Sequence, residues 1–260
     1  MKKIFSITLL AILLPAFTSF SVNAQQRKLK IGVEGAYPPF SELGTDGKIK
    51  GFDIDIANAL CEQMKAQCTL VQQEFDGMIP SLQAKKLDAI VASMSITDER
   101  KQVIEFSDKY YHTPARFVGR KNAALVATVA GMKGKRIGVQ RTTIHDRFAT
   151  DTFKESEIVR YAKQDDVFLD LTSGRLDAAL ADQIAASQGF LSLPSAKDFA
   201  FFGPVYIDPK YFGAGAGIGL RKADTALRDE FNAAIKAIRA NGVYKKINDK
   251  YFQFDVYGGK

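Results

Sequence analysis

The feature that most constrains the fold is an internal repeat in the order of short sequence segments. Residues 136–140 (Arg-Ile-Gly-Val-Gln) echo residues 30–34 (Lys-Ile-Gly-Val-Glu), and residues 171–178 echo residues 82–89, with Leu-Asp-Ala at the end of each. Strands that alternate with helices at this spacing are typical of parallel α/β sheets. The repeat therefore predicts two similar α/β lobes, and the alternative is coincidence between short common segments.

Extending the repeat aligns polar residues that follow the expected strands. It pairs Glu34 with Gln140 and Ser93 with Asp182, all at the carboxyl ends of strands. In open α/β sheets, ligands bind at this edge. We therefore expect these side chains to lie at a ligand site.

A second segment places two hydroxyls and a cation at the junction of a strand and a helix. Ser93 and Ser95, on either side of Met94, follow an apolar run, and Thr97 is a good N-cap for the helix after it. Arg100 lies in the first turn, where a cation opposes the helix dipole. A guanidinium beside free helix N–H groups is suited to a carboxylate or phosphate. The alternative is a surface arginine paired with a neighbouring acidic side chain.

The N-terminal residues predict an export signal. Lys2 and Lys3 precede an apolar run, and small residues before Gln25 fit a signal-peptidase site, so removal of residues 1–24 is expected. A membrane anchor is the alternative, disfavoured because Pro15 interrupts a run that falls short of about 20 apolar residues. No cysteine follows the cleavage position, so no lipid anchor is expected there, and we predict a soluble protein of the periplasm.

Charge and cysteine content narrow the function further. The formal net charge of +7 falls to +5 without the two leader lysines, and the basic residues are scattered, so no nucleic-acid partner is expected. Cys61 and Cys68 are expected to form a disulfide in an oxidising compartment. A redox pair or metal site is the alternative, but the spacing is not C-x-x-C and neither His112 nor His145 is near in sequence. We expect no metal or other cofactor.

Helical periodicity marks several segments. An apolar stripe predicts a helix over residues 52–64, with Asp53 on its polar face, and a short helix is expected at residues 78–84. Residues 225–240 and 243–251 predict amphipathic helices separated by Asn-Gly. The last two helices would pack on the first lobe, which makes that lobe discontinuous in sequence.

Several motifs, taken in order, resemble those of the family 3 periplasmic solute-binding proteins of polar amino-acid ABC transporters. The nearest branch contains the binders of lysine, arginine and ornithine, of histidine, and of arginine. The resemblance covers essentially the whole mature chain, including the cysteine spacing. The motifs that carry it are AYPPF at 36–40, GFDID at 51–55, FDGMIPSL at 75–82, SITDER at 95–100, GRLDA at 174–178 and KYFG at 210–213.

The resemblance implies the α/β, two-lobed type II fold of periplasmic binding proteins, in which each lobe is a mainly parallel sheet flanked by helices. Two hinge crossings would join residues 25–112 and 210–260 of the first lobe to residues 113–209 of the second. The implied activity is not enzymatic. A monomer would close on one basic amino acid and deliver it to an inner-membrane ABC permease.

The resemblance also implies a ligand-binding set. It assigns the ligand α-carboxylate to Arg100 and to backbone N–H groups near Thr143. It assigns the α-ammonium to Asp182, with help from Ser93 and Ser95. The full set is Glu34, Tyr37, Phe75, Ser93, Met94, Ser95, Arg100, Thr143 and Asp182.

The same resemblance favours a cationic side chain on the ligand. Tyr37 and Phe75 would sandwich that side chain, and an anionic Glu34 would meet its far end. Ala92 replaces a serine found in some lysine-preferring relatives, which favours a weakly hydrated guanidinium over an ammonium. We therefore expect arginine, with ornithine, lysine or histidine as further ligands. As alternatives, the two aromatics are core residues, Glu34 forms a surface ion pair, and Asp182 caps a helix.

Two other functions stay open at this point. A periplasmic enzyme on the same fold, such as a cyclic-acid dehydratase, needs a free acid or base, and Glu34 and Asp182 are the candidates. An opine-binding or sensory protein is the other alternative. Residues 141–145 depart from the family pattern because they lack the glycine that is usual near Thr142. It therefore stays open which N–H group holds the carboxylate, and whether Arg141 adds a charge at the mouth of the site.

Overall fold

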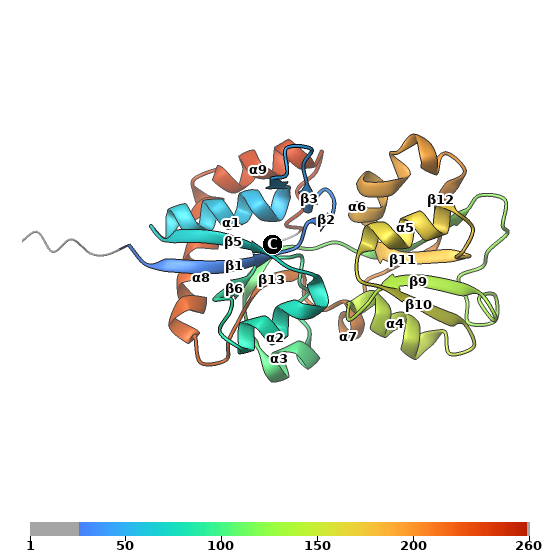
Figure 1. The fold of residues 1–260 in the computed structure, drawn as a ribbon, viewed down its shortest axis with the longest axis horizontal. Coiled ribbons are helices and arrows are strands. Elements are labelled where there is room, and N and C mark those ends of the chain that lie inside the picture. Colours follow the sequence, from blue (N-terminus) through green and yellow to red (C-terminus); the bar gives the residue numbers. More distant parts are fainter. Residues whose placement is uncertain (1–25, 259–260) are drawn as a thin grey trace, which may run out of the picture.

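The chain forms two lobes that lie side by side (Figure 1). The computed structural model describes residues 26–258, so the predicted export signal lies outside the described residues. Short connections between β7 and β8 and after β12 carry the chain from one lobe to the other. The lobe limits predicted at 112/113 and 209/210 stay a prediction. Within residues 26–258, no helix combines the length and apolar character needed to cross a membrane.

The first lobe is built on a five-stranded sheet in the order β5-β1-β6-β13-β7. β13 is antiparallel to both neighbours, while β1 is parallel to β5 and β6, so the sheet is mainly parallel as predicted. Its strands are β1 (Lys28–Val33), β5 (Gln67–Gln72), β6 (Ala89–Ile90), β7 (Glu105–Tyr111) and β13 (Ala216–Leu220). A small antiparallel sheet of β2 (Ala36–Tyr37), β3 (Ser41–Leu43) and β4 (Ile49–Lys50) extends this lobe toward the second.

The second lobe repeats the arrangement with a sheet in the order β10-β9-β11-β8-β12. Here β8 is the antiparallel strand, between β11 and β12. The strands are β8 (Ala115–Arg120), β9 (Arg136–Gln140), β10 (Glu157–Tyr161), β11 (Ala178–Asp182) and β12 (Phe199–Tyr206). The two orders correspond position by position, which confirms the two similar lobes predicted from the repeat.

The correspondence extends to single hydrogen bonds. In the first lobe the Asp88 carboxylate accepts from the backbone N–H of Lys30 at 2.9 Å, and in the second Asp177 accepts from that of Arg136 at 2.7 Å. Asp88 directly precedes β6 and bonds to β1, and Asp177 directly precedes β11 and bonds to β9, so each bond joins neighbouring parallel strands at corresponding places in the two sheets. The Leu-Asp-Ala segments therefore repeat because each aspartate fixes the same strand register.

Each repeated glycine makes room for a repeated leucine. A Cβ atom on Gly32 would lie 2.6 Å from Leu87, and one on Gly138 would lie 2.3 Å from Leu176. Real Cβ contacts are not this short, so a larger residue would displace a buried leucine from beneath either strand. The glycine in the Ile-Gly-Val segment is thus a packing requirement in both lobes.

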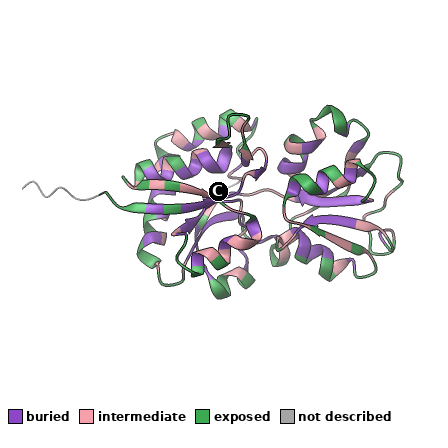
Figure 2. Ribbon diagram, viewed as in Figure 1, coloured by how far each residue is buried: buried purple, intermediate pink, exposed green. Residues whose placement is uncertain are grey.

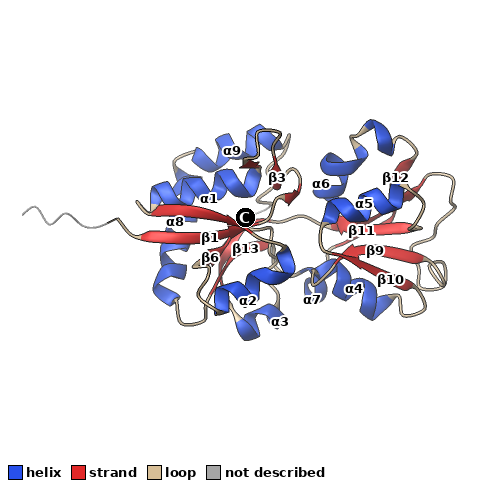
Figure 3. Cartoon of the chain, in the orientation of Figure 1, coloured by secondary structure: helices blue, strands red, loops and turns tan. Residues whose placement is uncertain are grey.

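Helices cover both faces of each sheet (Figure 3). In the first lobe, α1, α8 and α9 pack together on one face, and α2 and α3 lie against the other. In the second lobe, α4 and α5 cover opposite faces, and buried residues line the strands of both lobes (Figure 2). The helices are α1 (Phe52–Gln63), α2 (Met78–Gln83), α3 (Asp98–Val103), α4 (Ile144–Thr152), α5 (Gln164–Thr172), α6 (Gln183–Ala186), α7 (Pro209–Phe212), α8 (Thr225–Ala240) and α9 (Val243–Tyr251).

The predicted disulfide is confirmed. Cys61 lies near the end of α1, and its sulfur is bonded to that of Cys68 at the start of β5. The bridge closes a loop of sequence separation 7, for which chain entropy gives less than about 3 kcal/mol of stabilisation. It fixes the helix to the sheet at the end of β5 opposite the carboxyl edge.

Candidate ligand-binding site

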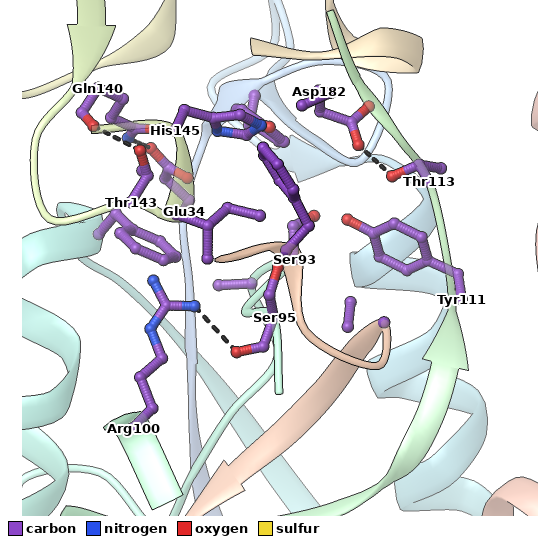
Figure 4. A pocket seen from close by; sticks show the side chains of 18 residues that line it. Glu34, Ser93, Ser95, Arg100, Tyr111, Thr113, Gln140, Thr143, His145 and Asp182 are labelled. Atoms are coloured by element: carbon purple, nitrogen blue, oxygen red, sulfur yellow. Dashed lines mark hydrogen bonds between the residues drawn. The ribbon is translucent and has the colours of Figure 1, made fainter. Parts of the chain in front are cut away.

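A cavity lies between the lobes, at the carboxyl ends of β1, β6, β9 and β11 (Figure 4). Both lobes and the connections between them contribute side chains to its lining. Eight members of the predicted set line it: Glu34, Tyr37, Phe75, Ser93, Ser95, Arg100, Thr143 and Asp182. The structure therefore brings together residues that are up to 148 positions apart in sequence.

Met94 is the predicted residue that the cavity lining does not include. Its side chain is 1% exposed and packs in the apolar cluster beneath the site. Its backbone oxygen accepts from the N–H of Gly217 at 3.0 Å. Ser93 and Ser95 line the cavity, whereas the Met94 side chain between them packs into the core.

Arg100 is positioned by the start of α3. The Thr97 hydroxyl caps this helix by accepting from the Arg100 N–H at 3.3 Å. The guanidinium donates to the backbone oxygen of Ser95 at 3.0 Å and to that of Thr142, in the other lobe, at 3.1 Å. It lies 5.4 Å from the ring centroid of Phe75. Burial lowers the pKa of Arg100 to about 10, so the cavity contains a cation at neutral pH.

Asp182 ends β11 and caps α6. Its Oδ1 accepts from the N–H groups of Ile184 at 2.7 Å and Ala185 at 3.0 Å, and the Thr113 hydroxyl donates to Oδ2. Burial raises the pKa of Asp182 to about 6, although these hydrogen bonds favour the ionised form. The helix cap considered from the sequence is confirmed, and the same carboxylate also lines the cavity.

Glu34 follows β1 and is only 5% exposed. The Gln140 side chain of the other lobe donates from Nε2 to Glu34 Oε1 at 2.6 Å, so the alternative of a surface ion pair is wrong. Burial, with a smaller contribution from the nearby Asp53 carboxylate, raises the pKa of Glu34 to about 8. A buried carboxylate with an amide as its partner lacks a neutralising charge.

The two predicted aromatics line the cavity and also belong to the apolar cores. Tyr37 stacks on Phe40 with a centroid distance of 5.9 Å, and Phe75 packs with the residues of α2. Each is 7% exposed. Both interpretations of these two residues are therefore correct, because each side chain packs in an apolar core and also lines the cavity.

The first turn of α4 opens into the cavity. Thr143 caps the helix by accepting from the Asp146 N–H at 3.2 Å, and its hydroxyl donates to the Gln140 backbone oxygen at 2.7 Å. Thr142 has φ of 60°, a conformation that glycine adopts more readily. The glycine missing from residues 141–145 is thus replaced by a threonine in the left-handed region.

Arg141 is not among the cavity-lining residues, but it joins the two lobes through ion pairs. Its guanidinium is 3.1 Å from Glu74 Oε2 and 2.6 Å from Asp76 Oδ2, both in the first lobe. All three side chains are 26–50% exposed. The charge of Arg141 is therefore already paired with two acidic side chains of the first lobe.

Sequence reasoning missed several lining residues. His145 is buried, and burial together with the Arg100 charge lowers its pKa to about 3, so the imidazole is neutral. Tyr111 is the last residue of β7, while Thr113 and Phe212 come from the connections between the lobes, where no periodic pattern marks a functional side chain. Gln140 was aligned with Glu34 but given no role.

The described residues offer no site for a metal, since no group of three or more His, Cys, Asp or Glu side chains among them is placed to hold one. The lining instead combines charged side chains of both signs with four aromatic rings, those of Tyr37, Phe75, Tyr111 and Phe212. Two lobes of one topology with such a polar cavity between their carboxyl edges define the class of two-lobed solute-binding proteins.

The chain belongs to the bacterial extracellular solute-binding proteins, family 3, whose sequence pattern matches residues 29–254. It is 51% identical to an L-arginine-binding protein of Pseudomonas aeruginosa over 260 residues, 99% of each chain. It is 46% identical to a histidine-binding periplasmic protein of Salmonella typhimurium over 262 residues, 100% of each chain.

A solved structure shares the fold with a TM-score of 0.81 at 38% identity, covering 87% of this chain and 100% of the other. It is a periplasmic binding protein of Salmonella typhimurium described for its high arginine specificity. These named relatives are binding proteins rather than enzymes.

Proposed function

We propose that the protein captures a cationic L-amino acid, arginine first, and delivers it to the permease of an ABC importer. The observation that carries this proposal is Glu34, a buried carboxyl group with no cationic partner within residues 26–258, in a cavity that also contains Arg100 and Asp182. The cation Arg100 can bind the α-carboxylate of an amino acid, and the anion Asp182 can bind its α-ammonium. Glu34 remains to pair with a third charge, which a cationic side chain provides when it binds and Glu34 loses its proton.

The site residues take the following parts in this proposal. Arg100 and the N–H groups of the first turn of α4, near Thr143, bind the α-carboxylate. Asp182 binds the α-ammonium, with Ser93 and Ser95 as further acceptors. The rings of Tyr37 and Phe75 hold the side chain between them, and Glu34 pairs with the distal guanidinium. Met94 contributes through the backbone geometry that aims its two serine neighbours.

The cellular setting follows from the same proposal. The chain is exported through a cleaved N-terminal signal, works in the periplasm as a monomer, and meets an inner-membrane permease. Ornithine, lysine and histidine are secondary ligands. A dehydratase-type enzyme is disfavoured because both acidic residues of the cavity already hold hydrogen-bond partners, Gln140 for Glu34 and Thr113 for Asp182.

Calorimetric titration of unfolded and refolded protein tests the proposal, because refolding removes carried-over ligand. We expect arginine to bind most tightly among arginine, lysine, ornithine, histidine and glutamine. Arg100→Ala should abolish binding, while Arg27→Ala, a surface cation at the opposite end of β1, should leave it unchanged. No heat with any cationic amino acid, or a preference for glutamine, would reject the proposed ligand class.

A further inference from the structure

Asp53 lies under the cavity rather than on the polar face of α1, where the sequence placed it. It is the second residue of α1 and is 0% exposed. Its Oδ2 accepts from the Ser93 hydroxyl at 2.8 Å, and its Oδ1 accepts from the Tyr110 hydroxyl at 2.8 Å. The Tyr110 oxygen in turn accepts from the Ser93 N–H at 3.0 Å. The three groups form a closed ring of hydrogen bonds.

The ring fixes which way each hydroxyl proton points. An ionised carboxylate accepts hydrogen bonds and donates none. When Asp53 is ionised, the Ser93 and Tyr110 protons are therefore both directed at it. Ser93 lines the cavity, and its Oγ then has only lone pairs left to offer a ligand. A serine hydroxyl without this partner would rotate and offer either a proton or a lone pair.

The ring also holds Ser93 in an uncommon backbone conformation. Its φ is 53°, in the left-handed region that non-glycine residues seldom adopt. The Tyr110 oxygen accepts a hydrogen bond from the Ser93 N–H, and Asp53 accepts one from the Ser93 hydroxyl. The backbone and the side chain of Ser93 are therefore both held in place. Burial raises the pKa of Asp53 to about 7, while its hydrogen bonds with Ser93 and Tyr110 favour the ionised form.

We propose that Asp53 is a positioning residue for ligand selectivity: by taking the proton of Ser93, it presents Ser93 Oγ to the cavity as a fixed acceptor for the ligand's α-ammonium. This inference rests on the proposed function, in which the α-ammonium lies near Ser93 and Asp182. Asp53 itself does not touch the ligand. Its contribution is to make Ser93 Oγ an acceptor for the ligand's ammonium. The Ser93 hydroxyl proton, which bonds to Asp53, is then not available to a hydrogen-bond acceptor on a ligand.

The test is Asp53→Asn, which keeps the side-chain volume but turns one acceptor into a donor. We expect the affinity for arginine to fall roughly tenfold, the scale of one charge-assisted hydrogen bond. The comparison ligand is 5-guanidinopentanoic acid, which is arginine without its α-amino group, measured by competition. Its affinity should change less than about twofold, because it has no ammonium for Ser93 to accept from.

A double-mutant cycle with Ser93→Ala separates positioning from a general effect on the fold. In the Ser93→Ala background, Asp53→Asn should cost less than about twofold in arginine affinity, since the oxygen that it positions is gone. If Asp53→Asn does not fold, Tyr110→Phe replaces it. That variant removes two of the three hydrogen bonds and should weaken arginine, but not the deaminated ligand, by about threefold.

Two outcomes overturn the inference. Equal losses for both ligands would show that Asp53 supports the whole cavity, and additive effects of Asp53→Asn and Ser93→Ala would show that it does not act through Ser93. Failure of the unsubstituted protein to bind any cationic amino acid has a different meaning, because it rejects the proposed function before Asp53 is tested.

Discussion

Replacing Glu34 by glutamine changes the charge at the far end of the cavity with little change in shape. Gln140 Nε2 now donates to Glu34 Oε1 at 2.6 Å, and a glutamine oxygen accepts the same hydrogen bond, so the fold is expected to persist. The substitution should weaken arginine and should spare citrulline, whose neutral urea group has nearly the shape of the guanidinium.

The magnitude follows from two opposing terms. Removing one partner of a buried, hydrogen-bonded charge pair costs about 2–5 kcal/mol. In the free protein the pKa of Glu34 is about 8, so ionising it at pH 7 to meet a cation costs about 1.4 kcal/mol. The difference, about 0.6–3.6 kcal/mol, predicts a roughly 3- to 400-fold loss of arginine affinity at pH 7.

Calorimetry of Glu34→Gln with arginine and with citrulline measures this selectivity. Glu62→Gln, an exposed glutamate near the end of α1, is the matched control and should change neither affinity. Binding of arginine to the unsubstituted protein should also release protons at pH 7, seen as a dependence of the heat on buffer ionisation. Equal losses for arginine and citrulline would refute the reasoning, because Glu34 would then not read the ligand's charge.

Two further predictions concern closure and pH. Arg141→Ala removes two partly exposed ion pairs between the lobes, each worth about 0.2–1 kcal/mol, so the open form should gain roughly 2- to 30-fold in population. Small-angle scattering of the ligand-free variant at low salt should show a larger radius of gyration than that of the unsubstituted protein. An unchanged radius would show that the Arg141 ion pairs do not hold the lobes together. The pKa values of Glu34 and Asp53, about 8 and about 7, lie above the usual 4.5 and 3.8, so the folded state keeps protons that the unfolded state has lost. The free energy of unfolding of the ligand-free protein should therefore decrease as pH rises from about 7 to 8, above the pKa of 6.5 at which His145 titrates in the unfolded chain, and denaturant titrations that show a flat or rising profile would contradict this.

The sequence predicted best where local pattern and tertiary packing agree. The helices expected at residues 225–240 and 243–251 are α8 and α9 with the same limits, because strong amphipathic periodicity and the intervening Asn-Gly mark both ends. The two-lobed fold followed from the repeat because Ile-Gly-Val and Leu-Asp-Ala encode a packing contact and a register bond in each lobe. The packing contact and the hydrogen bond each depend on one or two residues, so they can be recognised in short sequence segments.

The less successful predictions concern residues whose neighbours in the fold come from segments far away in the sequence. Asp53 was predicted to lie on the polar face of its helix from the sequence of that helix alone. The helical pattern contains no information about Tyr110, a residue of β7 whose hydroxyl donates to Asp53. Met94 was included with its serine neighbours because a segment resemblance does not distinguish which side chains point inward. Thr113 and Phe212 reach the cavity from connections between the lobes, and their position depends on how the lobes meet.

The position of β13 has a consequence for the order in which the lobes form. The second sheet uses only β8 to β12, which are consecutive in the chain, so this lobe holds all of its strands in one stretch. The first sheet needs β13 between β6 and β7, and β13 follows the whole second lobe. Until residues 216–220 arrive, β6 and β7 present unpaired edges. The connectivity thus favours a folding sequence in which the second lobe forms independently and the N-terminal lobe is completed last.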